Sequence, residues 1–226
     1  RLANGLRVRL VEIHRLPIVA LHLVLLQGGA AHDPPELGGV AGFTAAMVTE
    51  GTRTRSSTRI SDELGFIGAT LGAGASMDAA YLSGSCLSRH LPTLVELMGD
   101  VAATPAFPEA DFARLQDQRR VALLQQRDQP GAVASKTFGP LYWGAHPYGH
   151  WILGTEESVG RTTREDLARF HAERWRPEGS ELVVVGDVDE AALREMLTRA
   201  FAGWTGAARP APPAPAPPAP RRRAVL

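Results

Sequence analysis

The sequence predicts an α+β fold, an antiparallel (mixed) sheet with helices packed on it. Short segments in which apolar residues alternate or are continuous predict strands, and longer segments with a helical apolar period predict helices. Their order along the chain is β-β-α-α-β-β-α-α-α-β-α. The short segments come mostly as neighbouring pairs, which is typical of antiparallel hairpins. A chain of 226 residues, 44% of them hydrophobic, is also long enough to bury one sizeable core.

Two strands are predicted at the N-terminus. Asn4-Gly5 is a tight-turn signal, and residues 6–13 then alternate apolar and charged side chains. Residues 18–29 (IVALHLVLLQGG) are mostly β-branched or aliphatic and end in a glycine pair. We therefore expect this second strand to be buried on both faces.

A break precedes the first predicted helix. Pro34 and Pro35 are placed to start it. Val40, Phe43 and Met47 then fall at i, i+3 and i+7 and form one apolar stripe. This spacing predicts a helix that docks on the core through one face.

A second helix is predicted over residues 54–68, with Ile60, Leu64 and Ile67 as its apolar stripe. The next segment, residues 69–88, is rich in Gly and Ser and alternates small side chains. This composition favours two strands over a helix.

Two further helices and a loop are predicted in the middle of the chain. Residues 90–105 and 108–130 each have a helical pattern that ends at a proline. Residues 142–154 (YWGAHPYGHWILG) are expected to form a loop.

The C-terminal part combines two helices with one strand. Thr162 and Glu165 have the spacing of a capping box, which predicts a helix that ends before Pro177. Residues 181–188 (ELVVVGDV) predict a buried strand, and residues 189–204 predict the final helix.

The composition excludes several classes of function. Lys+Arg and Asp+Glu both number 24, so the charge gives no case for binding nucleic acid or an anionic membrane. The single Cys86 allows neither an intrachain disulfide nor a cysteine-based zinc cluster. No apolar run approaches the length of a transmembrane segment.

The tail differs from the rest of the chain. Residues 207–220 are almost entirely Pro and Ala, which predicts an extended linker rather than part of a packed core. Residues 221–226 (RRRAVL) could begin another strand. The alternative is a disordered tail.

Six stretches together resemble the N-terminal domain of the pitrilysin/insulinase family, the inverted-zincin metallopeptidases that include mitochondrial processing peptidase. They are LANGLRVRLVE, GGAAHDPPELGGVAGF, EGTRTRSSTRISDELGFIGATLGAGASMD, TPAFPEADFARLQDQ, AHPYGHWILGTEESV and FHAERWRPEGSELVVVGDVD. The resemblance implies that residues 1–206 are one half of a processing-peptidase-like, two-half molecule. Residues 207–220 would then be the linker, and residues 221–226 the start of a second homologous domain, truncated here.

Active members of this family carry H-x-x-E-H on the first helix. Histidines at i and i+4 share one helix face and can bind one zinc ion, while the glutamate serves as general base. A glutamate from a later helix is the third ligand. The resemblance places this motif on Gly42-Phe43-Thr44-Ala45-Ala46.

The aligned positions hold neither a zinc ligand nor a base. Gly42 and Ala46 stand in place of the two histidines, and Ala45 stands in place of the glutamate. The third ligand would fall within residues 121–124 (VALL), and no Glu occurs over residues 110–155. We therefore expect no catalytic residue, no metal ligand and no cofactor in this chain, with zinc only in an active partner.

Other candidate chemistry is weaker. His146 and His150 have i, i+4 spacing, but a proline and a glycine lie between them, which favours a structural loop. His14 and His22 lie on or beside predicted strands, where a surface or hydrogen-bonded histidine is the usual case, and a site shared with a carboxylate stays open. Cys86 is expected to fill the core rather than act as a nucleophile.

A small-residue strand is the candidate substrate-binding element. Gly72, Ala73, Gly74, Ala75 and Ser76 match the place where active relatives bind an extended peptide along a sheet edge. Small side chains would allow a peptide backbone to approach closely. The alternative is that these residues only pack under a helix.

The resemblance implies a non-catalytic subunit of a metallopeptidase, which helps to enclose and bind peptide substrate for a zinc-bearing homologous subunit. Self-association is a second form of partnership. Two alternatives stay open, a structural subunit with no role in proteolysis and a peptidase that uses unrecognised ligands. The compartment is not fixed by the sequence, and a bacterial periplasmic or envelope setting is a guess from the resemblance and the composition.

Overall fold

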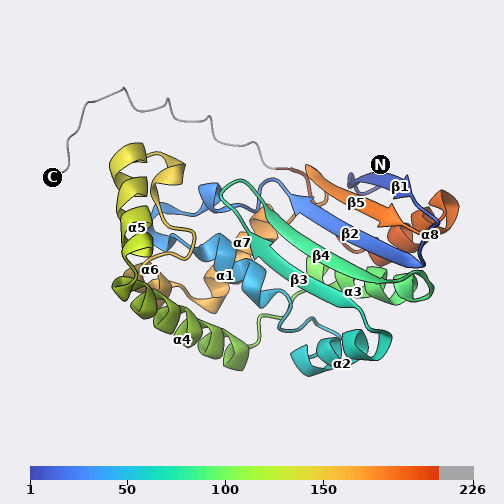
Figure 1. The fold of residues 1–226 in the computed structure, drawn as a ribbon, viewed down its shortest axis with the longest axis horizontal. Coiled ribbons are helices and arrows are strands. Elements are labelled where there is room, and N and C mark those ends of the chain that lie inside the picture. The colour runs from blue at the N-terminus through green and yellow to red at the C-terminus, as the bar shows by residue number, and fades with distance from the viewer. Residues whose placement is uncertain (209–226) are drawn as a thin grey trace.

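The computed structural model describes residues 1–208, which form a five-stranded mixed sheet with helices packed on it (Figure 1). The strand order is β1-β5-β2-β4-β3. β1 pairs with β5 in parallel, and the other neighbouring pairs are antiparallel. The predicted fold class is confirmed. The strands are β1 (Arg7–Glu12), β2 (Ile18–Leu25), β3 (Thr70–Ala75), β4 (Ala80–Leu87) and β5 (Ser180–Gly186).

The helices follow the predicted order with two additions, α5 and α6. Over residues 1–208 the α-helices are α1 (Val40–Met47), α2 (Ser57–Ile67), α3 (Leu91–Ala103), α4 (Glu109–Gln125), α5 (Pro130–Trp143), α6 (Glu156–Arg161), α7 (Arg164–Arg174) and α8 (Glu190–Ala200). Short 3-10 helices in the same part of the chain are η1 (Ala30–His32), η2 (Pro35–Leu37), η3 (Ser88–His90), η4 (Gln126–Asp128) and η5 (Pro147–Gly149).

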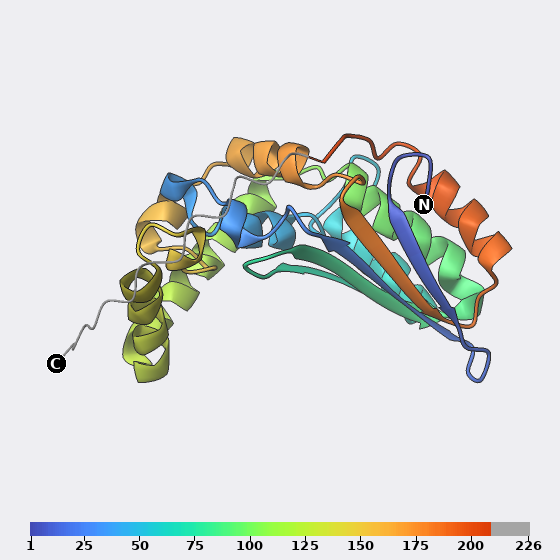
Figure 2. The same ribbon diagram turned by 90° about the horizontal axis from the view of Figure 1, so that it is seen from above.

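The sheet is buried on one face only. In β2 the side chains of Val19, Leu21, Leu23 and Leu25 are at most 2% exposed, whereas the intervening Ile18, Ala20 and His22 are exposed. The prediction that β2 is buried on both faces was therefore wrong. Figure 2 shows the reason, because α3 and α8 lie on one side of the sheet and no described helix covers the other.

The neighbouring strand β4 repeats this alternation. Ala80, Leu82 and Cys86 face the core and are at most 4% exposed, so the prediction that Cys86 fills the core is confirmed. Burial raises the pKa of the Cys86 thiol to about 11, so the thiol stays protonated and unreactive at neutral pH. Tyr81 and Ser83 point to the open face.

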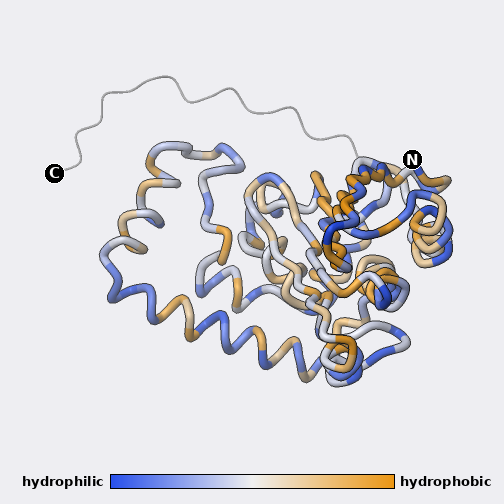
Figure 3. Tube along the Cα trace, turned by 45° about the vertical axis from the view of Figure 1, so that its right-hand side comes forward, coloured by the Kyte–Doolittle hydropathy of each residue, from blue (hydrophilic) through white to orange (hydrophobic). Residues whose placement is uncertain are grey.

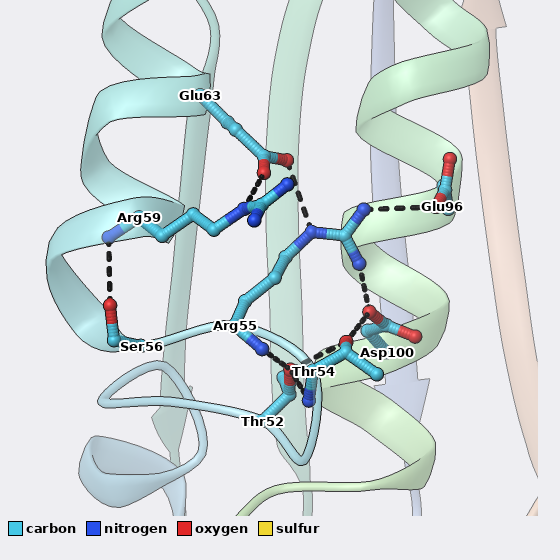
Figure 4. A network of polar contacts seen from close by, with 8 residues as sticks. All are labelled: Thr52, Thr54, Arg55, Ser56, Arg59, Glu63, Glu96 and Asp100. Carbon is cyan, nitrogen blue, oxygen red and sulfur yellow. Dashed lines mark hydrogen bonds and ion pairs between the residues drawn. The ribbon is translucent and has the colours of Figure 1, made fainter.

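Arg55 fastens α2 to α3 (Figure 4). Its guanidinium donates to Glu63 on α2 at 3.0 Å, to Glu96 on α3 at 2.9 Å, and to Asp100 on α3. The Arg55 side chain is only 13% exposed, so these bonds are better shielded from water than ordinary surface ion pairs. This network fixes the segment that leads from α1 to α2.

Helices α4, α5 and α6 form an arm beside the sheet (Figures 1 and 2). Figure 3 shows hydrophilic and hydrophobic segments alternating along α4. Phe112 and Leu123 are the residues of α4 that are fully buried.

The helix α5 was not predicted, and it includes the first two residues of the loop expected over residues 142–154. Pro130, read from the sequence as the end of α4, is the first residue of α5, where its missing N–H is not needed. Two glycines and Pro140 within α5 conceal its helical pattern. Residues 144–154 form the expected loop, apart from η5.

The capping box of α7 lies one residue later than predicted. The hydroxyl of Thr163 accepts the N–H of Asp166 at 3.2 Å, and the Asp166 carboxylate accepts the N–H of Thr163 at 2.9 Å. Thr162 instead ends α6, where its hydroxyl donates to the carbonyl of Ser158. The second unpredicted helix, α6, thus uses the threonine that we assigned to α7.

Among residues 1–208, no helix combines the length and the apolar character that crossing a bilayer requires. The expected linker, residues 207–220, lies outside the described residues apart from its first two positions. The expected start of a second domain, residues 221–226, also lies outside them.

Candidate functional site

The helix α1, which carries the positions aligned with the zinc motif, is held at its N-terminus by Asp33. Gly39 precedes the helix with φ = 98° and offers no side-chain cap. The Asp33 carboxylate takes over this role, because it accepts the N–H of Gly39 at 2.6 Å and that of Ala41 at 2.9 Å. Its side chain is 1% exposed, so these charge-assisted bonds form away from water.

His150 completes the environment of Asp33. Its Nε2 lies 3.0 Å from Oδ2 of Asp33, and this hydrogen bond raises the pKa of His150 above its usual value. His146 turns to another partner, since its Nδ1 accepts the N–H of Tyr148 at 3.1 Å. The two histidines with i, i+4 spacing therefore serve separate structural contacts.

The helix α6 also contacts the start of α1. Ser158 donates its hydroxyl hydrogen to the carbonyl of Gly38 at 2.7 Å. A Cβ atom at Gly154 would lie 2.2 Å from that same carbonyl oxygen, so only glycine fits there. The polar groups of Ser158 and Asp33 thus fix where α1 begins.

One face of α1 docks on the core as predicted. Val40, Phe43 and Met47 are at most 1% exposed. Gly42 and Ala46, the positions aligned with the two histidines, are half-buried, and they lie four residues apart on a second face. Ala45, aligned with the general base, is fully buried.

The helix α4 faces α1 near these positions. Within residues 121–124, Val121 and Leu124 are 52% and 46% exposed, and Leu123 is buried in the core. Ala122 and Leu123 both share a helix face with Arg119, three and four residues earlier, and Ala122 is the half-buried one of the two. Because Arg119 contacts α1 and Leu123 is fully buried, we take Ala122 as the position on α4 for a third ligand.

Arg119 is the functional-site residue that the sequence reading missed. Its Cζ lies 4.8 Å from the ring centroid of Phe43, which also stacks on Phe112 with centroids 5.2 Å apart. A Cβ atom on Gly42 would lie 3.4 Å from Nη2 of Arg119. The available signal was that Arg119 is one helical turn after Leu115, on the helix face that also carries Phe112 and Leu123.

The residues present do not fit a zinc ion. Glycine and alanine have no donor atom, and an arginine cation stands beside Gly42. Over the described residues, no group of three or more His, Cys, Asp or Glu side chains is placed to hold a metal. His14 pairs with Asp187 at 2.9 Å, and Nδ1 of His22 lies 2.6 Å from Oγ of Ser83.

The candidate peptide-binding residues lie on β3, at one edge of the sheet. Among the described strands β3 pairs with β4 alone. Gly72 is exposed, and a Cβ atom there would meet nothing within 4 Å. Ala73 and Ala75 pack partly against the core, and a Cβ atom on Gly74 would meet the Tyr81 hydroxyl at 2.4 Å. The strand thus contacts α1, and its outward face is open at Gly72.

Ser76, the last of these five residues, is occupied by the β3–β4 turn. Its hydroxyl accepts the N–H groups of Asp78 and Ala79 at 3.2 and 3.1 Å and donates to the carbonyl of Ala79 at 3.2 Å. This local pattern is typical of a serine turn. Ser76 therefore shapes the turn.

Comparison with protein-family models shows the family to which this chain is related. The family model described as "Insulinase (Peptidase family M16)" matches residues 10–144. The chain belongs to the insulinase family of M16 peptidases. A second model, described as "Peptidase M16 inactive domain", matches residues 161–225.

Curated relatives of this M16 chain include proteins named as proteases. An uncharacterized zinc protease of Rickettsia bellii is 24% identical over 205 residues, which cover 91% of this chain and 50% of the relative. A probable mitochondrial-processing peptidase subunit beta of Schizosaccharomyces pombe is 25% identical over 88% of this chain and 44% of its own length. The chain therefore spans about half the length of the curated relatives it matches.

Solved M16 structures share the fold. A "peptidase M16 inactive domain" from Pseudomonas fluorescens superposes with a TM-score of 0.87 at 29% identity, covering 93% of this chain and 51% of that one. Pitrilysin superposes with a TM-score of 0.80 at 20% identity, covering 91% of this chain and 22% of that one. The chain thus matches 51% of the Pseudomonas fluorescens chain and 22% of pitrilysin.

Proposed function

We propose that this chain is a non-catalytic subunit of an insulinase/pitrilysin-type metallopeptidase, which helps to enclose and bind peptide substrate for a zinc-bearing homologous subunit. The observation that carries the proposal is the state of α1. Its docking face, with Phe43 and Met47, is intact, and its N-terminus is held by Asp33. Gly42 and Ala46 nevertheless offer no atom that could bind zinc.

The peptide would bind along β3. An edge strand offers unpaired backbone N–H and C=O groups, to which an extended peptide can add as a further strand. Gly72 is exposed and has no side chain, which leaves room on the face of the strand for a neighbouring side chain of the peptide. β3 contacts α1, so the bound peptide would lie near the helix that carries the motif positions.

The open face of the sheet supports enclosure of the substrate. It carries polar contacts, with Thr70 and Ser85 joined at 3.0 Å and His22 stacked on Tyr81 with centroids 5.8 Å apart. It also carries exposed apolar side chains, among them Ile18 and Leu87. Such a face can line a chamber for peptides of varied sequence, because polar and apolar side chains are mixed on it. A second domain would follow residue 206 in the full-length protein, as the half-length match to its relatives suggests.

The test is reconstitution of the pair. The full-length protein is co-purified with a homologue from the same source that carries H-x-x-E-H, and hydrolysis of a quenched fluorescent peptide library is measured for the pair and for each chain alone. We expect the pair to hydrolyse peptides faster than the sum of its parts. An unchanged rate in a stable complex would favour a structural subunit, and hydrolysis by this chain alone would contradict the proposal.

A further inference from the structure

We propose that the guanidinium group of Arg119 occupies the vestigial zinc site, so that a side-chain cation takes the place of the first histidine and of the metal. The inference concerns α1 and α4 alone and does not depend on the proposed function. It rests on the position, the volume and the charge of the Arg119 side chain.

The position follows from the junction of the two helices. Phe112 and Arg119 lie seven residues apart on one face of α4, and Phe43 of α1 contacts both of them. Phe43 lies directly after Gly42 in the chain, within the stretch aligned with the zinc motif. Ala122, the position assigned to the third ligand, lies on the same face of α4. The arginine therefore reaches the position of the first histidine, Gly42.

The Arg119 side chain fills the space that a side chain at position 42 would need. A Cβ atom there would lie 3.4 Å from Nη2 of Arg119 and 3.3 Å from the carbonyl oxygen of Ile152. Both separations are shorter than most contacts of a Cβ atom, so even a single methyl group would require a small shift of its neighbours. An imidazole ring extends several further atoms beyond its Cβ, so it requires the space that the guanidinium fills. Gly42 and Arg119 are therefore complementary in size.

The Arg119 guanidinium keeps its positive charge in this position. Burial lowers the pKa of Arg119 to about 10, which still leaves it protonated at neutral pH, and Asp33 opposes this effect electrostatically. Nη1 is buried without a hydrogen-bond partner among the described residues. Contact with the face of the Phe43 ring offsets part of the cost. A cation is thus kept where the zinc of an active relative would be.

This arrangement has a consequence for any restored site. A protonated guanidinium repels a divalent cation, and the repulsion is strong because the site is shielded from water. Returning the missing ligands alone should therefore fail to restore metal binding. Removing Arg119 as well should permit it.

The experiment compares two restored variants of the full-length protein. One carries Gly42→His, Ala45→Glu, Ala46→His and Ala122→Glu, and the other adds Arg119→Met. Zn²⁺ affinity is measured by competition with a chromophoric chelator, and Co²⁺ is used to read the coordination from its visible spectrum. We expect binding to be at least about 10-fold tighter when Arg119 is replaced. Equal affinity in the two backgrounds would overturn the proposal.

A matched control separates the site from the general loss of an arginine. Arg120, the next residue, is 45% exposed and pairs with Asp117. Adding Arg120→Met to the four substitutions should leave the metal affinity within about twofold. An effect as large as that of Arg119→Met would also overturn the proposal.

A second measurement needs neither metal nor restored ligands, and it remains available if the restored variants do not fold. Gly42→Ala and Arg119→Met are made singly and together, and thermal midpoints are compared. The added methyl group contacts Nη2, so the two shifts should fail to add, with Gly42→Ala better tolerated once Arg119 is methionine. Additive shifts would contradict the proposed complementarity.

Discussion

Asp33 and His150, 117 positions apart in the chain, are joined by a 3.0 Å contact between Oδ2 and Nε2. The same carboxylate accepts two backbone N–H groups at the start of α1. One buried side chain therefore connects the degenerate zinc helix to the loop between α5 and α6. The relationship makes Asp33 a structural residue at the base of the site.

Removing the charge of Asp33 should destabilise the fold. Asp33→Asn keeps the size but weakens three hydrogen bonds to a group that is 1% exposed, so we expect a loss of about 2 kcal/mol in the free energy of unfolding. The measurement is urea denaturation. Asp117→Asn, at a carboxylate that is 74% exposed, is the control and should change stability by less than about 0.5 kcal/mol. Equal effects of the two substitutions would show that Asp33 does not hold α1.

The Arg55 network should contribute more than its neighbouring ion pair. Arg55→Met removes hydrogen bonds to three carboxylates across α2 and α3, and we expect a loss of about 2 kcal/mol. Arg59→Met, at a side chain that is 66% exposed, should cost less than about 0.5 kcal/mol. Thermal unfolding of both variants checks the prediction, which fails if their midpoints agree.

His171 should make the protein acid-sensitive. Burial lowers its pKa to about 4, and its Nε2 donates to the carbonyl of Ala102 at 3.0 Å, so it is neutral in the fold. The unfolded state binds a proton at His171 near pH 6.5, whereas the folded state does not. The stability that the neutral His171 contributes is therefore present above pH 6.5 and is lost as the pH falls toward 4. We expect a loss on the order of 2 kcal/mol between these limits.

The control for this effect is His171→Gln, which cannot be charged. Its stability should change less over the same pH range, when both proteins are followed by urea denaturation. His150 acts in the opposite sense, since its raised pKa adds stability at acid pH that is lost as pH rises through that pKa. A steeper acid loss in the glutamine variant would contradict the assignment to His171.

Replacing Gly72 should leave the fold stable but weaken peptide binding. A Cβ atom at this position meets nothing within 4 Å, so Gly72→Leu should leave the thermal midpoint nearly unchanged. The added side chain would stand on the open face of the sheet, against the side chains of a peptide paired with β3, and we expect peptide hydrolysis by the reconstituted pair to fall at least about 10-fold. Gly65→Leu is the control, because this glycine on α2 is equally open. Equal rates for the two variants would remove β3 from the substrate path.

Most elements of the fold could be predicted because their apolar periods are regular. The stripe of Val40, Phe43 and Met47 predicted α1, and the alternating small residues predicted β3 and β4. The helix α5 has no fully buried residue, so it has no apolar stripe that a sequence reading could detect. The exposure of β2 on one face could not be read from an aliphatic run, because the covering layer is a tertiary property.

The sequence shows which ligands of the motif are missing, but it does not show which residue lies beside their positions. A motif specifies which ligands should be present, so the glycine and alanines at positions 42, 45 and 46 are readable directly. Arg119 lies 77 positions after Gly42 in the chain, and only the packing of α4 on α1 brings the two together. Asp33 was similarly hidden, because its hydrogen bonds reach backbone groups six and eight residues away.

The central claim is that the zinc helix of this M16 chain holds no zinc. It is tested most directly by the metal content of the full-length protein, purified after expression in zinc-supplemented medium and analysed by inductively coupled plasma mass spectrometry. The account predicts well below one zinc ion per chain, with a thermal midpoint that neither added zinc nor a chelator changes. One tightly bound zinc ion per chain, retained by wild-type α1 and lost together with peptidase activity on chelation, would contradict it.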